Sequence, residues 1–429
     1  MSESFLHYLW QFQYFTKYDL RTTQDDEIVV FHPGFKNTHA GPDFYQSRIK
    51  IGKLEWIGSV EIHILSSSWQ VHNHTVDEAY ENVVLHVVWN DDQPVKRIDG
   101  SIIPTLVLKN RVDDALHFAY KKLVNSPAEI PCASSFGHVS QIIKVSMLDR
   151  VFTERLEAKS QIISQLHVHN HMDWEETMYQ VLAKNFGFYV NADPFLQLAQ
   201  NLPYKTILKH RGNLLQIEAL LFGQAGFLED VLEDEYSITL KREYDLLSRK
   251  YSLKSGRLNK AQWRFLRLRP SNFPTIRLAQ FAKLLFLHQN LFSNLVEASA
   301  DMKWKIFFKI QQSEYWQTHY QFQKETPEEI PALGQISIDN LVINTVVPVL
   351  VAYGKSTGDQ MFVDRAITIL QHLNCEVNNI TRQWASLELK CTNAVDSQAM
   401  IELYNNFCLK RKCLECSIGA SLIKPISKC

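Results

Sequence analysis

Two carboxylates and a histidine stand where their side chains could converge on one reaction centre. Asp43 follows the turn residues Gly41-Pro42 at the start of one strand-like stretch, and Glu61 and His63 lie midway along the next. Side chains two residues apart on a strand project from the same face, so Glu61 and His63 share a face while their apolar neighbours point to the other. Polar groups on an otherwise apolar strand need partners or a chemical role.

The chemistry that these residue types suit is metal-assisted hydrolysis. Phosphodiester cleavage needs one or two divalent ions held by carboxylates, together with a polar group that orients the attacking water. Asp43 and Glu61 could bind Mg²⁺ or Mn²⁺, and His63 could orient the water. The alternative is a half-buried strand on which Glu61 and His63 pair with each other or with Arg48.

Histidines are concentrated in the same part of the chain, since seven of the sixteen precede residue 90. His72, His74 and Asp77 could bind Zn²⁺, because imidazole and carboxylate are suitable ligands, although their spacing differs from the metallo-β-lactamase pattern. A zinc-dependent hydrolase is therefore kept as an alternative. We expect these three residues, together with His39, to line the same cleft as Asp43.

A small sheet must position these residues. Apolar, β-branched and aromatic runs predict strands over 28–31, 44–51, 54–65, 83–88 and 102–108. Helical spacing predicts an amphipathic helix over 4–16, and a short helix is expected over 77–80. The order is helix, three strands, helix, strand, in an α+β layer. His86, between apolar neighbours, is predicted to be a core histidine.

The turn-borne Pro42-Asp43 and the strand-borne Glu61-Ile62-His63, in this element order, resemble the PD-(D/E)XK nuclease-like superfamily. The resemblance covers residues 1–110. It implies a restriction-endonuclease-like α-β-β-β-α-β core, a Mg²⁺ or Mn²⁺ ion at Asp43 and Glu61, and nuclease activity. His63 stands where the superfamily has lysine, and an imidazole can accept a proton or hold a water. This departure leaves open a non-catalytic nucleic-acid or protein binding module with the same fold.

Basic residues are concentrated between positions 241 and 277. This segment contains eleven Lys and Arg residues and only two acidic residues. Phosphate backbones are the usual partner of such a segment. The residues expected to contact nucleic acid are Arg257, Lys260, Arg264, Arg267, Arg269 and Arg277. Trp263, Phe265 and Phe273 could stack on bases. The alternative is a solvated basic face with its aromatic side chains in the core.

Three cysteines cluster late in the chain. Cys408, Cys413 and Cys416 lie among basic residues, which favour the thiolate form that binds metal. Cys132 or Cys391 could supply a fourth ligand. The layout is similar to the iron–sulfur staple of some nucleases related to bacterial recombination enzymes, which implies a cluster; Zn²⁺, or free structural thiols in a reducing cytosol, are the alternatives. The odd total of seven cysteines argues against a disulfide framework.

Composition sets the limits on the whole chain. Its 429 residues are 45% hydrophobic and 21% charged, which predicts two or three buried cores rather than disorder. The formal net charge of −1 means that any nucleic-acid contact must come from a local patch. The first residues lack the features of a signal peptide, which predicts a cytoplasmic location. The apolar run 341–351 falls short of the ~20 residues of a membrane span, so a buried helix and no membrane partner are expected.

Helical periodicity dominates from residue 139 onward and predicts a second, mainly helical domain. The expected helices cover 142–156, 175–186, 195–202, 214–221, 276–296, 338–352, 360–373 and 397–407. We therefore predict a nuclease-like domain over 1–125 and a helical domain with the cysteine cluster over 139–429. The whole chain, notably 185–191, 221–227 and the region of Cys408, also resembles an uncharacterised bacterial family, which names relatives but no activity.

Overall fold

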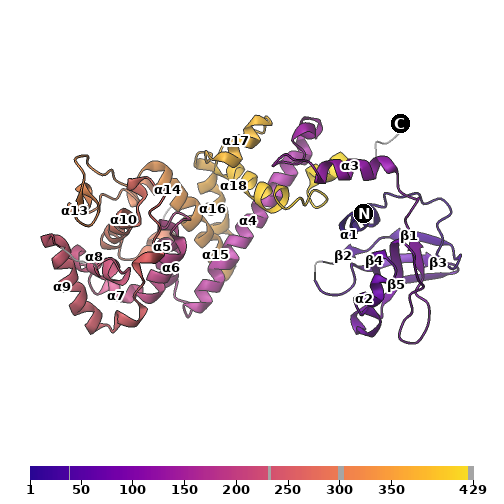
Figure 1. Ribbon diagram of the computed structural model, residues 1–429, viewed down its shortest axis with the longest axis horizontal. Helices are drawn as coiled ribbons and strands as arrows, with labels where there is room; N and C mark the ends of the chain where they lie inside the picture. Colours follow the sequence, from indigo (N-terminus) through magenta and orange to yellow (C-terminus); the bar gives the residue numbers. More distant parts are fainter. Residues whose placement is uncertain (38, 230–232, 298–303, 424–429) are drawn as a thin grey trace. The chain divides into compact units, whose positions relative to one another are not determined.

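The computed structural model describes residues 1–37, 39–229, 233–297 and 304–423. The chain divides into two compact units (Figure 1). Unit 1 comprises Met1–Asp149 together with Glu402–Cys429, and unit 2 comprises Arg150–Ile401. The sequence predicted one break near residues 125–139, with the C-terminal segment in the helical domain. The contacts place that segment with unit 1, where the Tyr8 hydroxyl donates to the Ala420 carbonyl at 3.0 Å.

Among its described residues, unit 1 contains one six-stranded sheet with the order β1-β3-β4-β5-β6, and β2 pairs with β3. The strands are β1 (Ile28–His32), β2 (Phe35–Lys36), β3 (Phe44–Ile51), β4 (Leu54–Leu65), β5 (Val83–Asn90) and β6 (Thr105–Val107). The pairs β1–β3 and β3–β4 are antiparallel, whereas β4–β5 and β5–β6 are parallel. The bounds of β3 and β4 match the prediction because a hairpin separates them, with Gly52 at φ 58°, a value that glycine adopts readily.

Helices cover and connect this sheet. They are α1 (Glu3–Phe12), α2 (Ser68–Val71), η1 (His74–Val76), η2 (Glu78–Tyr80), α3 (Asp114–Val124), η3 (Ala133–His138), η8 (Tyr404–Cys408) and α19 (Ser417–Ile423). Helix α1 buries Phe5, Leu6, Leu9 and Trp10 and packs on β4. The short helices α2, η1 and η2 form the crossover that a parallel β4–β5 pair requires. Helix α3 was not predicted, because it buries only two apolar side chains.

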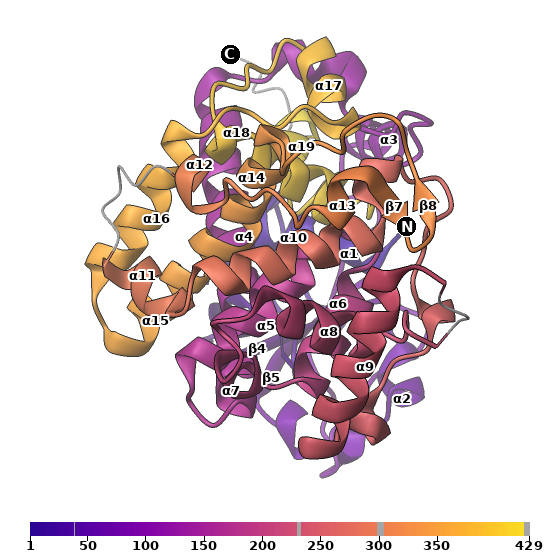
Figure 2. The same ribbon diagram turned by 90° about the vertical axis from the view of Figure 1, so that its left-hand side faces the viewer.

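Unit 2 is mainly helical, which confirms the prediction for this part of the chain (Figure 2). Its helices are α4 (Gln141–His169), which begins in unit 1, α5 (Trp174–Phe186), α6 (Ala192–Asn201), α7 (Tyr204–Leu208), α8 (Leu214–Gln224), α9 (Glu235–Lys250), η4 (Leu253–Gly256), η5 (Lys260–Gln262), η6 (Pro270–Asn272), α10 (Pro274–Leu287), α11 (Leu291–Glu297), α12 (Trp304–Phe307), α13 (Tyr315–Thr318), α14 (Gln335–Leu341), η7 (Val342–Val346), α15 (Val347–Thr357), α16 (Gln360–His372), α17 (Asn379–Ser386) and α18 (Ala394–Leu403). A small hairpin, β7 (His319–Gln321) and β8 (Lys324–Glu325), was not expected.

The predicted helix 276–296 is two helices, α10 and α11. The break between them is held by neighbouring elements, since His288 Nε2 lies 3.0 Å from the Phe307 carbonyl and the Tyr204 hydroxyl donates to the Gln289 carbonyl at 2.8 Å. Helix α10 packs against α8 and α5 in the core of unit 2 (Figure 2).

The apolar run around residue 345 lies in one continuous helix, Gln335–Thr357, that is longer than predicted. Pro348 does not end this helix. It removes a donor to the Asn344 carbonyl, which accepts instead from Asn185 Nδ2 at 3.0 Å. By length and composition the helix could cross a membrane, but 67% of its most apolar window is buried within the protein, as in a core helix.

Candidate metal centre

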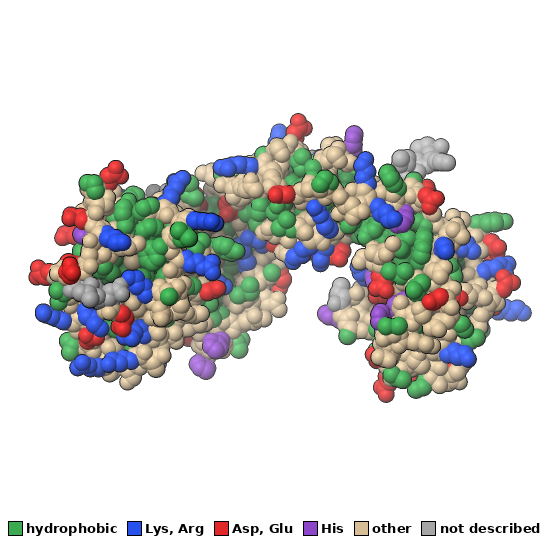
Figure 3. All heavy atoms as spheres, viewed as in Figure 1, with side chains coloured by type: hydrophobic (Ala, Val, Ile, Leu, Met, Phe, Trp, Pro, Cys, Tyr) green, Lys and Arg blue, Asp and Glu red, His purple; other side chains and the backbone are tan. Residues whose placement is uncertain are grey.

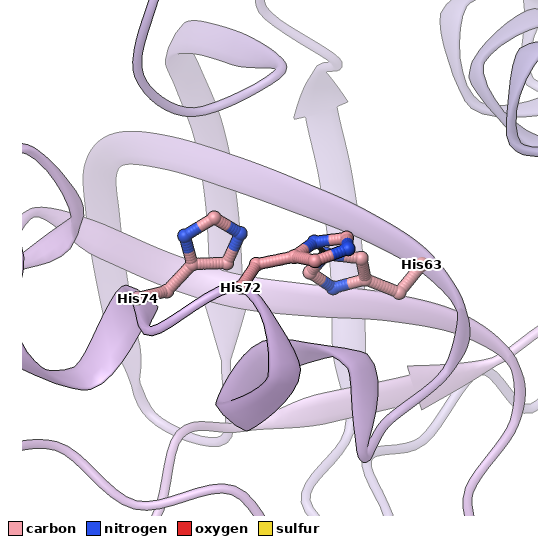
Figure 4. Close-up of side chains that lie close together, drawn as sticks. All are labelled: His63, His72 and His74. Carbon is pink, nitrogen blue, oxygen red and sulfur yellow. Dashed lines mark hydrogen bonds between the residues drawn. The ribbon is translucent and has the colours of Figure 1, made fainter.

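The predicted reactive residues meet at one side of the sheet in unit 1. Asp43 precedes β3, Glu61 and His63 lie on β4, and His72 and His74 belong to the crossover between β4 and β5. Figure 4 shows His63, His72 and His74 with their rings gathered beside one another, and the ring centroids of His63 lie 5.1 Å from His72 and 5.4 Å from His74. The crossover thus brings two histidines back over the strand that carries the third.

Asp43 and Glu61 are joined through the backbone of the β3–β4 hairpin. The Asp43 N–H donates to Glu61 Oε2 at 3.1 Å, and the Ile62 N–H donates to Asp43 Oδ2 at 3.0 Å. His7 of α1 places its Nε2 3.2 Å from Asp43 Oδ2. The two carboxylates are therefore fixed near each other without a cationic Lys or Arg between them among the described ion pairs.

Three histidine donors lie close enough together to share a metal ion, and Glu61 lies beside two of them. His63 Nε2 lies 3.1 Å from His72 Nδ1 and 3.5 Å from Glu61 Oε1, which in turn lies 3.4 Å from His74 Nε2. The ligand atoms of the three histidines all lie within 4.8 Å of one another. Bonds of 2.0–2.1 Å to a tetrahedral ion place its ligand atoms about 3.3 Å apart. The His63–His72 separation of 3.1 Å is close to this value, and the three histidines lie near enough to one another for a shared ion.

His86 on β5 orients the central ligand. Its Nε2 lies 2.9 Å from His63 Nδ1, and its side chain is fully buried. A proton on His63 Nδ1 that is donated to His86 leaves His63 Nε2 free to bind a cation, as outer-shell partners of metal-binding histidines commonly do. The sequence predicted a buried histidine at this position but not its contact with His63, because that contact depends on how β5 and β4 pair.

Burial sets the protonation of these groups. It lowers the pKa of His63 and of His86 to about 3, with neighbouring imidazoles adding to the effect, and it also lowers the pKa of His74. His63, His74 and His86 are therefore neutral at pH 7, which is the form that binds metal. Burial, and then the nearby charge of Asp43, raises the pKa of Glu61 to about 9.

His74 has a buried ring nitrogen, Nε2, without a hydrogen-bond partner among the described residues. The Tyr80 ring stacks on it with centroids 3.8 Å apart. Buried polar atoms in proteins are nearly always paired, so an orphan that faces Glu61 indicates a site built for a ligand.

A cavity of about 290 Å³ opens beside His74. Its lining includes Trp69, Asp77, Tyr80 and Arg97. The Asp77 carboxylate caps η2 by accepting from the Ala79 N–H at 3.0 Å. Asp77 therefore lines the predicted cleft but is not among the grouped metal donors, in contrast to the zinc set considered from sequence.

Two other candidates have different surroundings. His39 is exposed and is not among the three histidines grouped as donors. Arg48, the alternative partner of Glu61 and His63, instead pairs with Glu55. Glu61 and His63 do approach each other, at 3.5 Å, within the larger cluster.

The basic residues of the segment 241–277 lie in unit 2 and have different environments. The exposed ones are Arg257, Lys260, Arg264, Arg267 and Arg269, whereas Arg277 is buried. Arg257 pairs with Glu229 at 2.7 Å, and acidic side chains lie among the basic ones on the face of unit 2 that Figure 3 shows. Trp263 is also buried, with its Nε1 donating to the Ala225 carbonyl, so it belongs to the core and does not stack on bases.

Four cysteines lie buried among the described residues of unit 1: Cys132, Cys408, Cys413 and Cys416. Burial, and then the nearby thiols, raises the pKa of Cys132 to about 12, and burial and Cys416 raise that of Cys413 to about 11. Arg411 Nη1 donates to the Ala128 carbonyl at 2.8 Å and so ties the C-terminal loop to the segment before Cys132.

Cys391 is not the fourth member of this group. It forms a disulfide with Cys375 in unit 2. The sequence did not predict this bond, because an odd total of cysteines argues against a disulfide framework. Cys132, the other residue predicted as a fourth ligand, lies in the same unit as the C-terminal three.

The fold and the site together define a mixed α+β protein with a histidine–carboxylate centre in its first unit. The chain belongs to the family described as a protein of unknown function (DUF2851), whose profile matches residues 3–379. This match confirms the predicted relationship to an uncharacterised family. It includes Cys132 and all the donors of the centre but ends before Cys408. No curated protein and no solved structure matches the chain.

Proposed function

We propose that the protein is a metal-dependent phosphodiester hydrolase, a nuclease, with its centre in unit 1. The observation that carries the proposal is the group of three histidines, His63, His72 and His74, whose ligand atoms lie within 4.8 Å of one another, with Glu61 3.5 Å from His63 and 3.4 Å from His74. Asp43 adds a second carboxylate beside Glu61.

The strand order supports a nuclease-like core. Helix α1 precedes three strands that pair antiparallel, β1, β3 and β4, and the crossover leads to β5 parallel to β4. Asp43 precedes the second of these strands and Glu61-Ile62-His63 lies on the third. This is the arrangement that the resemblance to PD-(D/E)XK nucleases implies. The strand β2 pairs at the end of β3 and does not alter the order.

The donor types favour Zn²⁺ over Mg²⁺ or Mn²⁺ at this centre. Imidazole nitrogens suit Zn²⁺, whereas Mg²⁺ and Mn²⁺ prefer oxygen ligands. A bound ion would supply Lewis acidity and a water of lowered pKa. His63, His72 and His74 would hold the ion and leave its fourth position to a water, and Glu61 and Asp43 would orient that water or hold a proton beside it.

The cavity next to His74 provides a place for an anionic substrate. Arg97 lines it, and one guanidinium nitrogen donates to the Val83 carbonyl at 2.8 Å, which fixes the side chain. A fixed guanidinium suits a phosphate group. Tyr80 and Trp69 give the cavity aromatic walls on which a base or sugar could pack.

The proposal is tested by cleavage of single- and double-stranded DNA and RNA with Mn²⁺, Zn²⁺, Mg²⁺ or chelator. We expect metal-dependent cleavage by the wild type and its loss in Asp43→Ala and His72→Ala. The matched control is His39→Ala, which removes an exposed histidine from the same unit and should retain cleavage.

The competing function is a non-catalytic nucleic-acid binding module. It predicts binding that weakens with salt yet does not respond to metal or to Asp43→Ala. Absence of cleavage by folded, metal-replete protein would refute the nuclease. Analysis of bound metal tests metal binding separately from cleavage. Metal bound by the wild type and lost in His72→Ala would establish the metal centre even without cleavage.

We also propose that Cys132, Cys408, Cys413 and Cys416 hold an iron–sulfur cluster. All four are buried and in one unit, although Cys132 lies far from the others in sequence. No three of these four sulfurs lie within 4.8 Å of one another. Tetrahedral Zn²⁺ with Zn–S bonds of about 2.3 Å requires sulfurs about 3.8 Å apart, whereas a cluster binds each sulfur to a different iron and suits a wider set.

The cluster is tested by anaerobic purification. We expect brown protein with broad visible absorbance that is lost in Cys132→Ser and retained in Cys375→Ser. Bound zinc without colour would replace the cluster with a zinc site, and colourless protein without zinc or iron would refute any metal there.

A further inference from the structure

Arg277, in the first turn of α10, is a buried cation without a counter-ion. Its side chain is 6% exposed, and among the described residues no carboxylate pairs with it. One terminal guanidinium nitrogen donates to Gln280 Oε1 at 2.8 Å, and the other donates to Asn272 Oδ1 and Ser337 Oγ. All three partners are neutral. The Arg277 Nε is buried and has no hydrogen-bond partner there.

The charge is not neutralised by its other neighbours. The guanidinium lies 4.3 Å from the centroid of the Phe188 ring, which is a favourable contact but supplies no negative charge. Burial is the single cause that lowers the pKa of Arg277, to about 10, so the side chain remains charged at pH 7. Buried charges in proteins are generally paired or coordinate an ion.

Arg277 lines a cavity of about 250 Å³ within unit 2. Phe186, Phe188 and Phe195 form part of its wall, and Ser337 lies on the lining beside the guanidinium. Ligand pockets combine such apolar walls with a few fixed polar groups. The volume is at the lower end of such pockets, which limits the occupant to a small molecule.

One wall of the cavity is a turn in an unusual conformation. Phe188 and Tyr189 have φ values of 44° and 69°, in the left-handed region that residues with side chains rarely adopt. Gly187 allows the turn to close, because a Cβ there would lie 2.4 Å from the Asn191 carbonyl. The Asn191 side-chain amide makes two hydrogen bonds to the backbone of Arg264. Its Nδ2 donates to the Arg264 carbonyl, and its Oδ1 accepts from the Arg264 N–H. Backbone strain of this kind is concentrated at ligand sites.

We propose that this cavity binds a small organic anion, either a carboxylate or a phosphate monoester with a compact apolar body. The oxyanion pairs with Arg277, and the apolar part packs against Phe186, Phe188 and Phe195. A planar guanidinium is the preferred partner of both kinds of oxyanion. The site is separate from the metal centre of unit 1 and does not depend on the proposed hydrolase.

This assignment changes the role predicted for Arg277 from the sequence. The sequence predicts that Arg277 contacts the phosphates of nucleic acid, together with the exposed arginines of the same segment. Its burial beside a cavity of about 250 Å³ suits a small molecule better than a polymer backbone. The excess of positive charge in the segment 241–277 thus includes one side chain that serves a different ligand.

The test is calorimetric titration of the full-length protein with benzoate, phenyl phosphate and inorganic phosphate, at constant ionic strength and with chelator to suppress binding at the metal centre. We expect saturable binding of benzoate or phenyl phosphate, at least tenfold weaker in Arg277→Gln. The matched control, Arg269→Gln, removes an exposed arginine nearby and should change the affinity less than twofold.

The three probes distinguish the possible ligands. Preference for benzoate identifies a carboxylate, preference for phenyl phosphate identifies a phosphate ester, and binding of inorganic phosphate alone would refute the role of the apolar wall. Binding that persists in Arg277→Gln, or no binding of any probe to folded wild type, would overturn the proposal. Should Arg277→Gln fail to fold, Ser337→Leu serves as a second variant, since it fills space beside the guanidinium and must also weaken binding.

Discussion

His63 uses both ring nitrogens to contact other imidazoles, His86 through Nδ1 and His72 through Nε2. A lysine at this position would place one point charge near the carboxylates and could not make both contacts. In the proposed centre, the histidine at this position would bind the ion itself and would not serve to orient water. The proposed hydrolase would thus use a histidine-rich centre.

The contact between His86 and His63 can be tested by substitution. His86→Leu keeps the volume of the side chain but removes the partner of His63 Nδ1. Loss of an outer-shell partner typically lowers metal affinity 10- to 100-fold, and we expect an effect of this size in titrations with Zn²⁺ or Mn²⁺. His86→Gln supplies an amide oxygen in the same region and should recover part of the affinity. Equal affinity in His86→Leu and wild type would show that His86 is only a core residue.

Glu218 in α8 predicts a pH dependence of the stability of unit 2. Burial raises its pKa from 4.5 to about 7, although Tyr236 and Ser313 donate to the carboxylate. The folded protein thus holds a proton that the unfolded chain has released between these pH values. The contribution of Glu218 to the free energy of unfolding is therefore largest below pH 4.5. This contribution falls by about 3 kcal/mol as the pH rises past 7.

The loss of stability with rising pH should be absent when the side chain at position 218 cannot ionise. In Glu218→Gln we expect the free energy of unfolding to stay constant where that of the wild type declines, as measured by denaturant unfolding from pH 4.5 to 8. Glu328→Gln, at an exposed position, should follow the wild type. Parallel curves for Glu218→Gln and wild type would contradict the prediction.

At the level of elements, the parallel pair β4–β5 holds the centre together, because β4 carries Glu61 and His63 and β5 carries His86. Gly58 lets the strands approach there, since a Cβ at this position would lie 2.4 Å from Val84 Cγ1 and 2.8 Å from the Asn82 carbonyl. Gly58→Ala should lower the free energy of unfolding of unit 1 by about 1–3 kcal/mol through overpacking. Denaturant unfolding measures this loss. Gly137→Ala, where no atom lies within 4 Å of the added Cβ, should be nearly neutral.

The exposed basic residues that follow α9 predict binding of polyanions by unit 2. Reversal of charge in the double variant Arg264→Glu with Arg267→Glu should abolish retention on a heparin or DNA column at moderate salt. The Arg277→Gln variant should be retained like the wild type, because that side chain is buried. Unchanged retention of the double variant would leave these arginines as an ordinary solvated surface.

The sequence predicted those parts of the site that local patterns determine. Asp43, Glu61 and His63 could be placed because a two-residue hairpin and strand alternation fix their faces. The pairing of His63 with His72 and His86 depends on the crossover and on the pairing of β5 with β4, neither of which has a local signal. The burial of Arg277 likewise follows from the turn 187–191 and from α14, elements far from it in sequence.

At the level of the whole molecule, unit 1 is discontinuous, because unit 2 is inserted between its two segments. A chain that ends at Leu403 lacks α19, which packs on α3, and three of the four clustered cysteines. We expect calorimetry to show a lower melting temperature for unit 1 in this variant and an unchanged transition for unit 2. A transition of unit 2 that shifts as much as that of unit 1 would contradict the division into units.

The insertion has a consequence for synthesis on the ribosome. After Asp149 emerges, roughly 250 further residues must be translated before the segment that completes unit 1, which takes on the order of tens of seconds at 5–20 residues per second. Unit 2, although later in sequence, has all its residues available first. During this interval the nascent first segment exposes the surfaces that α19 will cover and a Cys132 thiol without its three companions. Unit 2 can thus fold on the ribosome while unit 1 still lacks its last helix.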